Sequence, residues 1–98
     1  GAHYASSKGA ILTLTKIFSR ELASANVTVN AIAPGPLDLP SVRALVPPDK
    51  LDKLIENIPV RKLGNPAFVA DLALQLASPD ADFATGATWD INGGIFMR

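Results

Sequence analysis

Apolar residues recur at spacings of three and four between Ala5 and Ala25, and this period predicts one long helix. The apolar stripe consists of Ala10, Ile11, Leu14, Ile17, Phe18 and Leu22. Because few charges interrupt the segment, we expect the helix to bury more than one face. Asn26 follows as the expected left-handed C-cap, since asparagine tolerates positive φ better than most residues.

Two short apolar runs have the composition of strands. Residues Val27–Ala33 are β-branched and nearly uncharged, which favours a parallel strand covered on both faces. The turn residues Pro34, Gly35 and Pro36 end this strand. A second strand is predicted over Thr88–Asn92, where Gly93 and Gly94 close it.

Three further helices are expected between the strands. Broken helical patches cover Ser41–Leu45 and Asp49–Asn57, and a more regular helix starts from the Asn65 cap with Pro66 at its first position. The order helix, strand, helices, strand ends in a β-α-β unit and implies a parallel pair. Since two strands are too few for an open sheet, we predict an α/β fold that is one end of a doubly wound parallel sheet, with the remainder missing.

Composition narrows the classes of function. The 98 residues suffice for one domain, and nine Lys plus Arg balance nine Asp plus Glu, which disfavours nucleic acid and membrane surfaces as partners. Cysteine is absent, so disulfides, thiolate metal sites and a cysteine nucleophile are excluded. No membrane-spanning run or signal peptide is visible, and we expect a soluble, cytoplasmic protein. The separated acidic residues Asp80, Asp82 and Asp90 lack the spacing of a cation site, and no metal is predicted.

Tyr4 and Lys8 are the residues with the clearest chemical potential. They stand four apart at the start of the first helix and therefore share one face. A free tyrosine phenol has a pKa of about 10, and an ammonium group within hydrogen-bonding range favours its ionised form. The pair could thus supply a general acid, but the same spacing also fits two solvated residues on a first helical turn.

The surrounding motifs favour the first of these interpretations. Four ordered segments resemble motifs of the short-chain dehydrogenase/reductase family. They are Tyr4-Ala5-Ser6-Ser7-Lys8, Asn30-Ala31-Ile32-Ala33-Pro34-Gly35-Pro36, Arg61-Lys62-Leu63-Gly64-Asn65-Pro66, and Thr85-Gly86 with Asp90-Ile91-Asn92-Gly93-Gly94. The resemblance covers essentially the whole chain and is strongest to the subgroup of 3-oxoacyl-carrier-protein and acetoacetyl-CoA reductases. It implies the C-terminal part of a Rossmann-like doubly wound sheet.

The resemblance also implies a site and a chemistry. The family's tyrosine is the general acid/base, and its lysine binds the nicotinamide ribose and lowers the pKa of the tyrosine. The catalytic residues would be Tyr4 and Lys8; the cofactor, NADP or NAD, would contact Tyr4, Lys8, Pro34, Gly35, Pro36 and Leu37. The substrate would be a small-molecule carbonyl or alcohol, chosen by a lid over Pro40–Asn57, and the protein would form a homo-oligomer, a dimer or tetramer.

The sequence departs from the family pattern in two respects. It contains no glycine-rich phosphate turn, and Leu39 stands where many relatives carry a threonine that contacts the carboxamide. We therefore expect residues 1–98 to be a C-terminal fragment of a single dinucleotide-binding oxidoreductase domain, whose N-terminal half is missing. The alternative function is that of a catalytically incompetent fragment, truncated or proteolytic, that retains only oligomerisation surfaces.

Overall fold

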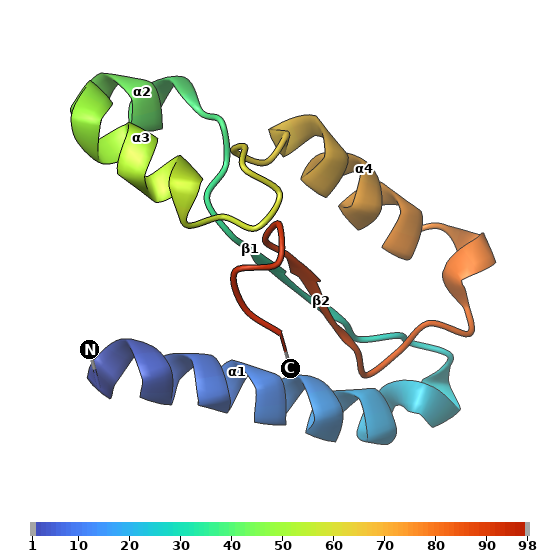
Figure 1. Ribbon diagram of the computed structural model, residues 1–98. Coiled ribbons are helices and arrows are strands. Elements are labelled where there is room, and N and C mark those ends of the chain that lie inside the picture. The colour runs from blue at the N-terminus through green and yellow to red at the C-terminus, as the bar shows by residue number, and fades with distance from the viewer. Residues whose placement is uncertain (1, 98) are drawn as a thin grey trace. The chain divides into compact units, whose positions relative to one another are not determined.

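The computed structural model describes residues 2–97, with side chains described from Ser7 onward. Its regular elements follow the predicted order (Figure 1). The elements are α1 (Ala2–Leu22), η1 (Ala23–Ala25), β1 (Ala31–Pro34), α2 (Pro40–Leu45), α3 (Pro48–Glu56), α4 (Pro66–Leu76), η2 (Pro79–Ala81) and β2 (Thr88–Ile91), where η marks a 3-10 helix. The chain divides into two compact units: unit 1 is Gly1–Ile32 with Ala73–Trp89, and unit 2 is Ala33–Leu72 with Asp90–Arg98.

β1 and β2 are neighbours in a two-stranded sheet. The Ala31 amide donates to the Ala87 carbonyl at 3.0 Å, and the Gly35 amide donates to the Ile91 carbonyl at 2.9 Å. Both bonds join residues at the same offset along the chain, which is the register of parallel strands. The predicted α/β class and the parallel pair are therefore confirmed.

Two predicted helix ends have the expected local chemistry. Asn26 has φ 60° and ψ 32° after η1, so its left-handed cap conformation is confirmed. At the start of α4, the Asn65 side-chain oxygen accepts the Ala67 amide at 2.9 Å. The first strand is shorter than predicted, because regular pairing begins only at Ala31.

The face of α1 that this chain buries differs from the prediction. The stripe residues remain exposed, from 56% for Ile11 to 38% for Leu22, whereas Thr15 and Ser19 are each only 6% exposed. The hydroxyls of Thr15 and Ser19 donate to helix carbonyls of Ile11 and Lys16, both at 2.8 Å. Among the described residues, α1 is buried only on the face of Thr15 and Ser19, so the expected burial of more than one face does not occur within this chain. The inward residues are small, and their hydroxyls are satisfied by their own helix.

Asn30 fixes the start of the sheet within unit 1. Its Nδ2 donates to the Ala84 carbonyl at 2.9 Å, and its Oδ1 accepts from the Ala87 amide and the Trp89 indole, both at 3.3 Å. One half-buried side chain thus holds the approach to β2 through three hydrogen bonds. These bonds hold the residue before β1 beside β2 and the segment that precedes it, although regular strand pairing begins only at Ala31.

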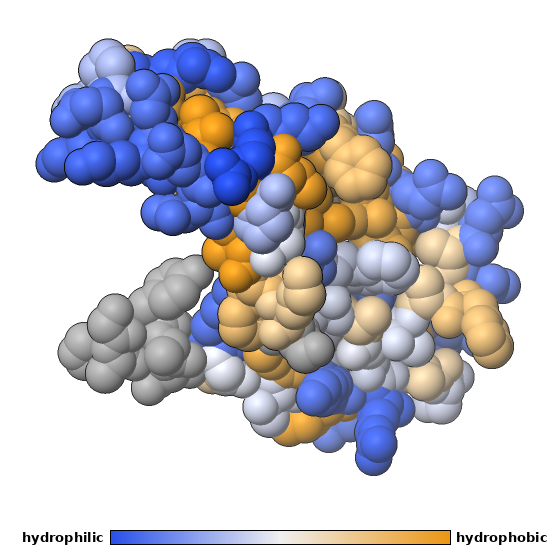
Figure 2. All heavy atoms as spheres, viewed as in Figure 1, coloured by the Kyte–Doolittle hydropathy of each residue, from blue (hydrophilic) through white to orange (hydrophobic). Residues whose placement is uncertain are grey.

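The buried hydrophobic residues that the structure describes lie in unit 2. Leu51 and Ile58 are buried, and Ile58 is only 1% exposed. Large apolar side chains also reach the surface among hydrophilic ones (Figure 2). Phe83 is fully exposed. No helix among residues 2–97 combines the length and apolarity needed to cross a membrane.

Candidate functional site

α1 carries Tyr4 and Lys8 in its first turns. The helix begins at Ala2, so both positions have helical backbone and share a face by their spacing. The Lys8 side chain is half-buried, whereas the Tyr4 side chain lies outside the described residues. At helical spacing Lys8 is aligned with Leu12, Thr15 and Ser19, the face that unit 1 covers. Lys8 therefore lies on the side of α1 that unit 1 covers.

The loop after β1 carries the other predicted site residues and is held at two points. The Gly35 amide donates to the Ile91 carbonyl at 2.9 Å, and the Pro36 carbonyl accepts the Gly64 amide at 2.9 Å. The Asp38 amide then donates to the Gly64 carbonyl at 2.7 Å. These bonds fix the backbone of Pro34–Leu37 against β2 on one side and the segment before α4 on the other.

Gly35 is required by a close approach to β2. A Cβ added at Gly35 would lie 2.7 Å from the Asn92 Cβ and 2.8 Å from the Asn92 Cα, closer than carbon atoms tolerate. Asn92 cannot readily withdraw, because its side chain accepts the Gly94 amide at 3.0 Å and donates to the Phe96 carbonyl at 2.9 Å. The glycine of the Pro-Gly-Pro motif therefore has a packing role that its position in the motif did not reveal.

The Leu37 amide is the one backbone donor that this loop leaves available in the described chain. Pro34 and Pro36 have no N–H, and the N–H of Gly35 is already bonded to Ile91. Among the described residues, the Leu37 N–H has no hydrogen-bond partner. A half-buried donor in a rigid loop is suited to an acceptor atom of a ligand.

An ion pair missed in the sequence lies directly after this loop. Arg43 Nε lies 2.6 Å from Asp38 Oδ1, and Arg43 Nη2 lies 3.0 Å from Asp38 Oδ2, a bidentate arrangement. The hydrogen bond from Arg43 lowers the pKa of Asp38, and the same bond raises the pKa of Arg43. An acidic residue before α2 followed by an arginine five positions later was the available signal. The pair links the loop to α2.

The titration of Asp38 tests this ion pair. Since its pKa is lowered in the folded chain, the pair stabilises the fold above the ordinary value of 3.8, and this contribution is lost as pH falls through the lowered value. We expect a carboxyl NMR titration of Arg43→Gln to return the Asp38 pKa toward 3.8. Lys53→Gln, on α3, is the matched control and should leave the curve unchanged; an Asp38 titration insensitive to Arg43→Gln would disprove the pairing in solution.

The predicted site residues fall into two groups. Tyr4 and Lys8 belong to unit 1, and Pro34, Gly35, Pro36 and Leu37 belong to unit 2. Tyr4 and Lys8 are one helical turn apart on α1, and Pro34–Leu37 form one loop. That both groups meet at one cofactor stays a prediction. Within residues 2–97, no cluster of three or more His, Cys, Asp or Glu is placed to hold a metal ion.

Comparisons with known proteins identify the class of protein. The family model described as enoyl-(acyl carrier protein) reductase matches residues 1–96. The chain belongs to the short-chain dehydrogenase/reductase family and corresponds to its C-terminal part, so the predicted resemblance is confirmed.

Individual relatives are consistent with this class. The 3-oxoacyl-[acyl-carrier-protein] reductase FabG of Vibrio harveyi is 39% identical over 95 residues, covering 97% of this chain and 38% of the relative. The protein of that name from Staphylococcus epidermidis is 40% identical over 96 residues, covering 98% of this chain and 39% of the relative. Acetoacetyl-CoA reductase of Cupriavidus necator is 36% identical over 95 residues, covering 97% and 38%. The chain thus spans less than two-fifths of the length of these curated relatives.

Proposed function

We propose that the protein containing this chain is an oxidoreductase that interconverts a small-molecule carbonyl compound and its alcohol, with NADP(H) or NAD(H) as cofactor. The family match over residues 1–96 is the observation that carries this proposal. Tyr4 and Lys8, one helical turn apart on α1, add support because a phenol beside an ammonium can serve as a general acid.

Each unit offers groups that suit the nicotinamide end of such a cofactor. In unit 2 the available Leu37 amide suits the carboxamide oxygen of a nicotinamide, and in unit 1 the Lys8 ammonium would donate to a ribose hydroxyl. Pro34, Gly35 and Pro36 would form the wall beside the ring. The cofactor, when bound, supplies the hydride. A glycine-rich turn for its phosphates does not occur in the sequence, so the fit extends only to this end.

Tyr4 would hold the proton that the reaction needs. During reduction, the O–H bond of the Tyr4 phenol breaks and its proton passes to the carbonyl oxygen of the substrate, and the remaining phenolate is stabilised by the Lys8 charge. In the direction of oxidation, the phenolate takes the alcohol proton back. Their spacing of four within α1 supports a joint action, because residues at this spacing share one face of a helix.

The substrate is proposed to be a 3-oxoacyl thioester. This rests on the names of the relatives, which are reductases of 3-oxoacyl-[acyl-carrier-protein] and acetoacetyl-CoA. α2 and α3 in unit 2 would form the lid that selects among such substrates, and the Asp38–Arg43 ion pair would anchor its start. Leu39 lies at the start of this lid, at the position where many family members have a threonine. Its apolar side chain cannot donate the hydrogen bond that a threonine hydroxyl would make to the nicotinamide carboxamide.

Residues 1–98 are proposed to be the C-terminal part of a single dinucleotide-binding domain. The exposed apolar stripe of α1 supports this, because a stripe of this size requires a covering surface. A homo-oligomer, a dimer or tetramer, would supply part of that cover. The isolated 98-residue chain is expected to be catalytically incompetent, which is the second candidate interpretation.

An assay of the complete gene product tests the proposal. NADPH oxidation with acetoacetyl-CoA, followed at 340 nm, is expected to proceed with the complete product and not with residues 1–98 alone. NADH is compared at the same concentration to establish the cofactor preference. Absence of carbonyl reduction by the folded complete product would overturn the enzymatic proposal and leave the binding or fragment interpretation.

A further inference from the structure

Two cations of α1 have no acidic partner in the part of the chain that the structure describes. Lys16 and Arg20 lie one turn apart, and both are exposed. No carboxylate oxygen among residues 2–97 lies within 4.0 Å of either side chain. The ion pair found in this part of the chain joins two other residues, Arg43 and Asp38. Like charges at this spacing repel each other, so the pair leaves an uncompensated positive charge on this side of the helix.

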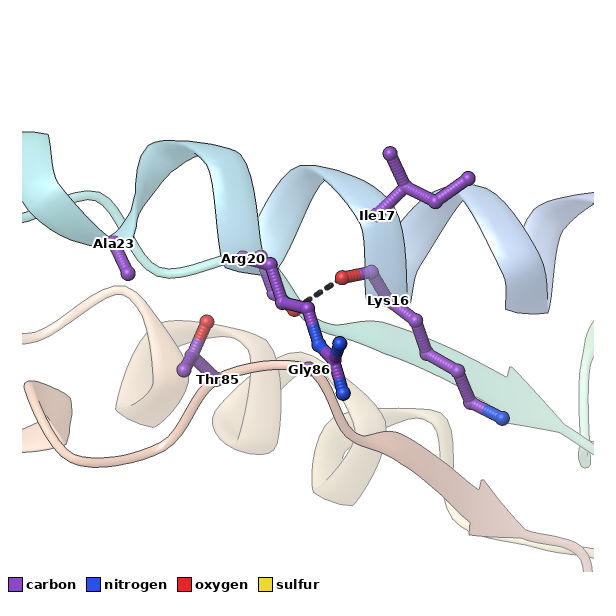
Figure 3. A pocket seen from close by; sticks show the side chains of 7 residues that line it. Lys16, Ile17, Arg20, Ala23, Thr85 and Gly86 are labelled. Carbon is purple, nitrogen blue, oxygen red and sulfur yellow. Dashed lines mark hydrogen bonds between the residues drawn. The ribbon is translucent and has the colours of Figure 1, made fainter.

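The two cations line a cavity of about 580 Å³ in unit 1. Thr85 and Gly86, in the loop before β2, form its opposite wall (Figure 3). Figure 3 shows the Lys16 and Arg20 side chains leaving α1 on the side of this loop. The lining contains no acidic residue, and Ala23 and Ile17 add apolar surface. A volume of this size is in the range of small-molecule sites.

The loop that faces the cations is fixed in place. Gly86 has φ +79°, and a Cβ there would lie 2.9 Å from the Ser19 hydroxyl, so only glycine lets the loop approach α1 this closely. The Gly86 amide donates to the Val29 carbonyl at 2.7 Å, and the Val29 amide donates to the Thr85 hydroxyl at 3.0 Å. The Thr85 oxygen is therefore an acceptor already, and the described residues leave its hydrogen free to be donated.

The basic pair lies on the opposite flank of α1 from Leu14 and Phe18 of the apolar stripe, while Ile17 of that stripe lines the cavity. At about 100° per residue, Lys16 and Arg20 lie to one side of the buried Thr15 and Ser19, and Leu14 and Phe18 lie to the other side. A surface that covers Leu14 and Phe18 therefore need not cover the cations. The cavity can remain open to a ligand when this part of the stripe is covered.

We propose that this cavity binds the phosphate group of a small molecule. A phosphate monoester carries close to two negative charges at neutral pH and several acceptor oxygens. The planar guanidinium of Arg20 matches two of these oxygens, Lys16 adds a second charge, and the Thr85 hydroxyl donates a further hydrogen bond. The ligand is either free phosphate or a phosphate ester whose organic part lies along Ala23.

Amide NMR titrations of the complete gene product test the site. Inorganic phosphate and glycerol phosphate are added separately, with sodium chloride and sodium acetate at matched ionic strength as controls. Saturable shifts of the Thr85 and Gly86 amides with phosphate support the site, and the tighter of the two probes identifies free phosphate or an ester as the source. Equal shifts with chloride or acetate would overturn the proposal.

Charge-removing variants establish which residues bind the probe. Arg20→Gln and Lys16→Gln are each expected to weaken binding by about tenfold, as loss of a charge-assisted hydrogen bond implies. Lys50→Gln removes an exposed charge from α3 and should leave the affinity unchanged. If Arg20→Gln fails to fold, Lys16→Gln carries the same test; unchanged affinity in a folded variant of either cation would exclude this cavity.

Discussion

Tyr4→Phe in the complete gene product is expected to lower kcat for carbonyl reduction by at least about 100-fold, the lower end of what a positioned general acid contributes. The substitution removes the phenolic proton and keeps the aromatic ring. Cofactor affinity should change little, because the ring and Lys8 remain in place. Turnover is measured by NADPH absorbance, and cofactor binding by a fluorescence titration.

Two variants of the same helix make this result interpretable. Thr13→Val removes an exposed hydroxyl that bonds only the Gly9 carbonyl at 3.1 Å, so its kcat should match that of the parent. Lys8→Ala should move the alkaline limb of the pH profile to higher pH, since the phenolate loses its stabilising charge. A fully active Tyr4→Phe enzyme would eliminate Tyr4 as the acid, even if the protein proves to be a reductase.

Local signals made most of the fold predictable. Asn26 could be assigned as a left-handed cap, and Asn65 with Pro66 as a helix start, because these residues act through their own backbone neighbourhood. The burial of α1 could not be predicted, because periodicity identifies which residues are apolar and not which surface covers them. Thr15 and Ser19 became the inward residues since the loop at Gly86 approaches the helix at small side chains.

The sequence likewise identified the candidate residues of the site but not the tertiary contacts around them. Tyr4, Lys8 and the Pro-Gly-Pro loop were recognisable from spacing and motif, whereas the available Leu37 amide depends on bonds that Gly35 makes with Ile91, far along the chain. The Asp38–Arg43 pair differs, because its residues are only five positions apart and that spacing was overlooked in the sequence. Contacts between residues far apart in the sequence leave no periodic pattern in it, so these contacts could not be predicted.

Gly35→Ala is expected to destabilise the protein by about 1–3 kcal/mol, the usual cost of forcing an extra methyl group into a packed position. The added Cβ would meet both the Cβ and the backbone Cα of Asn92. A backbone atom cannot rotate away, so β1 and β2 must separate where Gly35 donates to Ile91. Urea unfolding followed by circular dichroism measures the loss.

Gly9→Ala is the same chemical change, and we expect it to alter the stability of the protein in the opposite direction. Gly9 lies inside α1, and a Cβ there would meet no atom within 4 Å. The substitution should therefore stabilise the protein by about 0.5–1 kcal/mol through the lower backbone entropy of the unfolded alanine chain. Opposite signs for the two variants would attribute the Gly35 effect to contact with Asn92 rather than to glycine replacement in general. If Gly35→Ala is as stable as the parent, the strands do not approach each other this closely in solution, and the loop is less rigid than a fixed Leu37 amide requires.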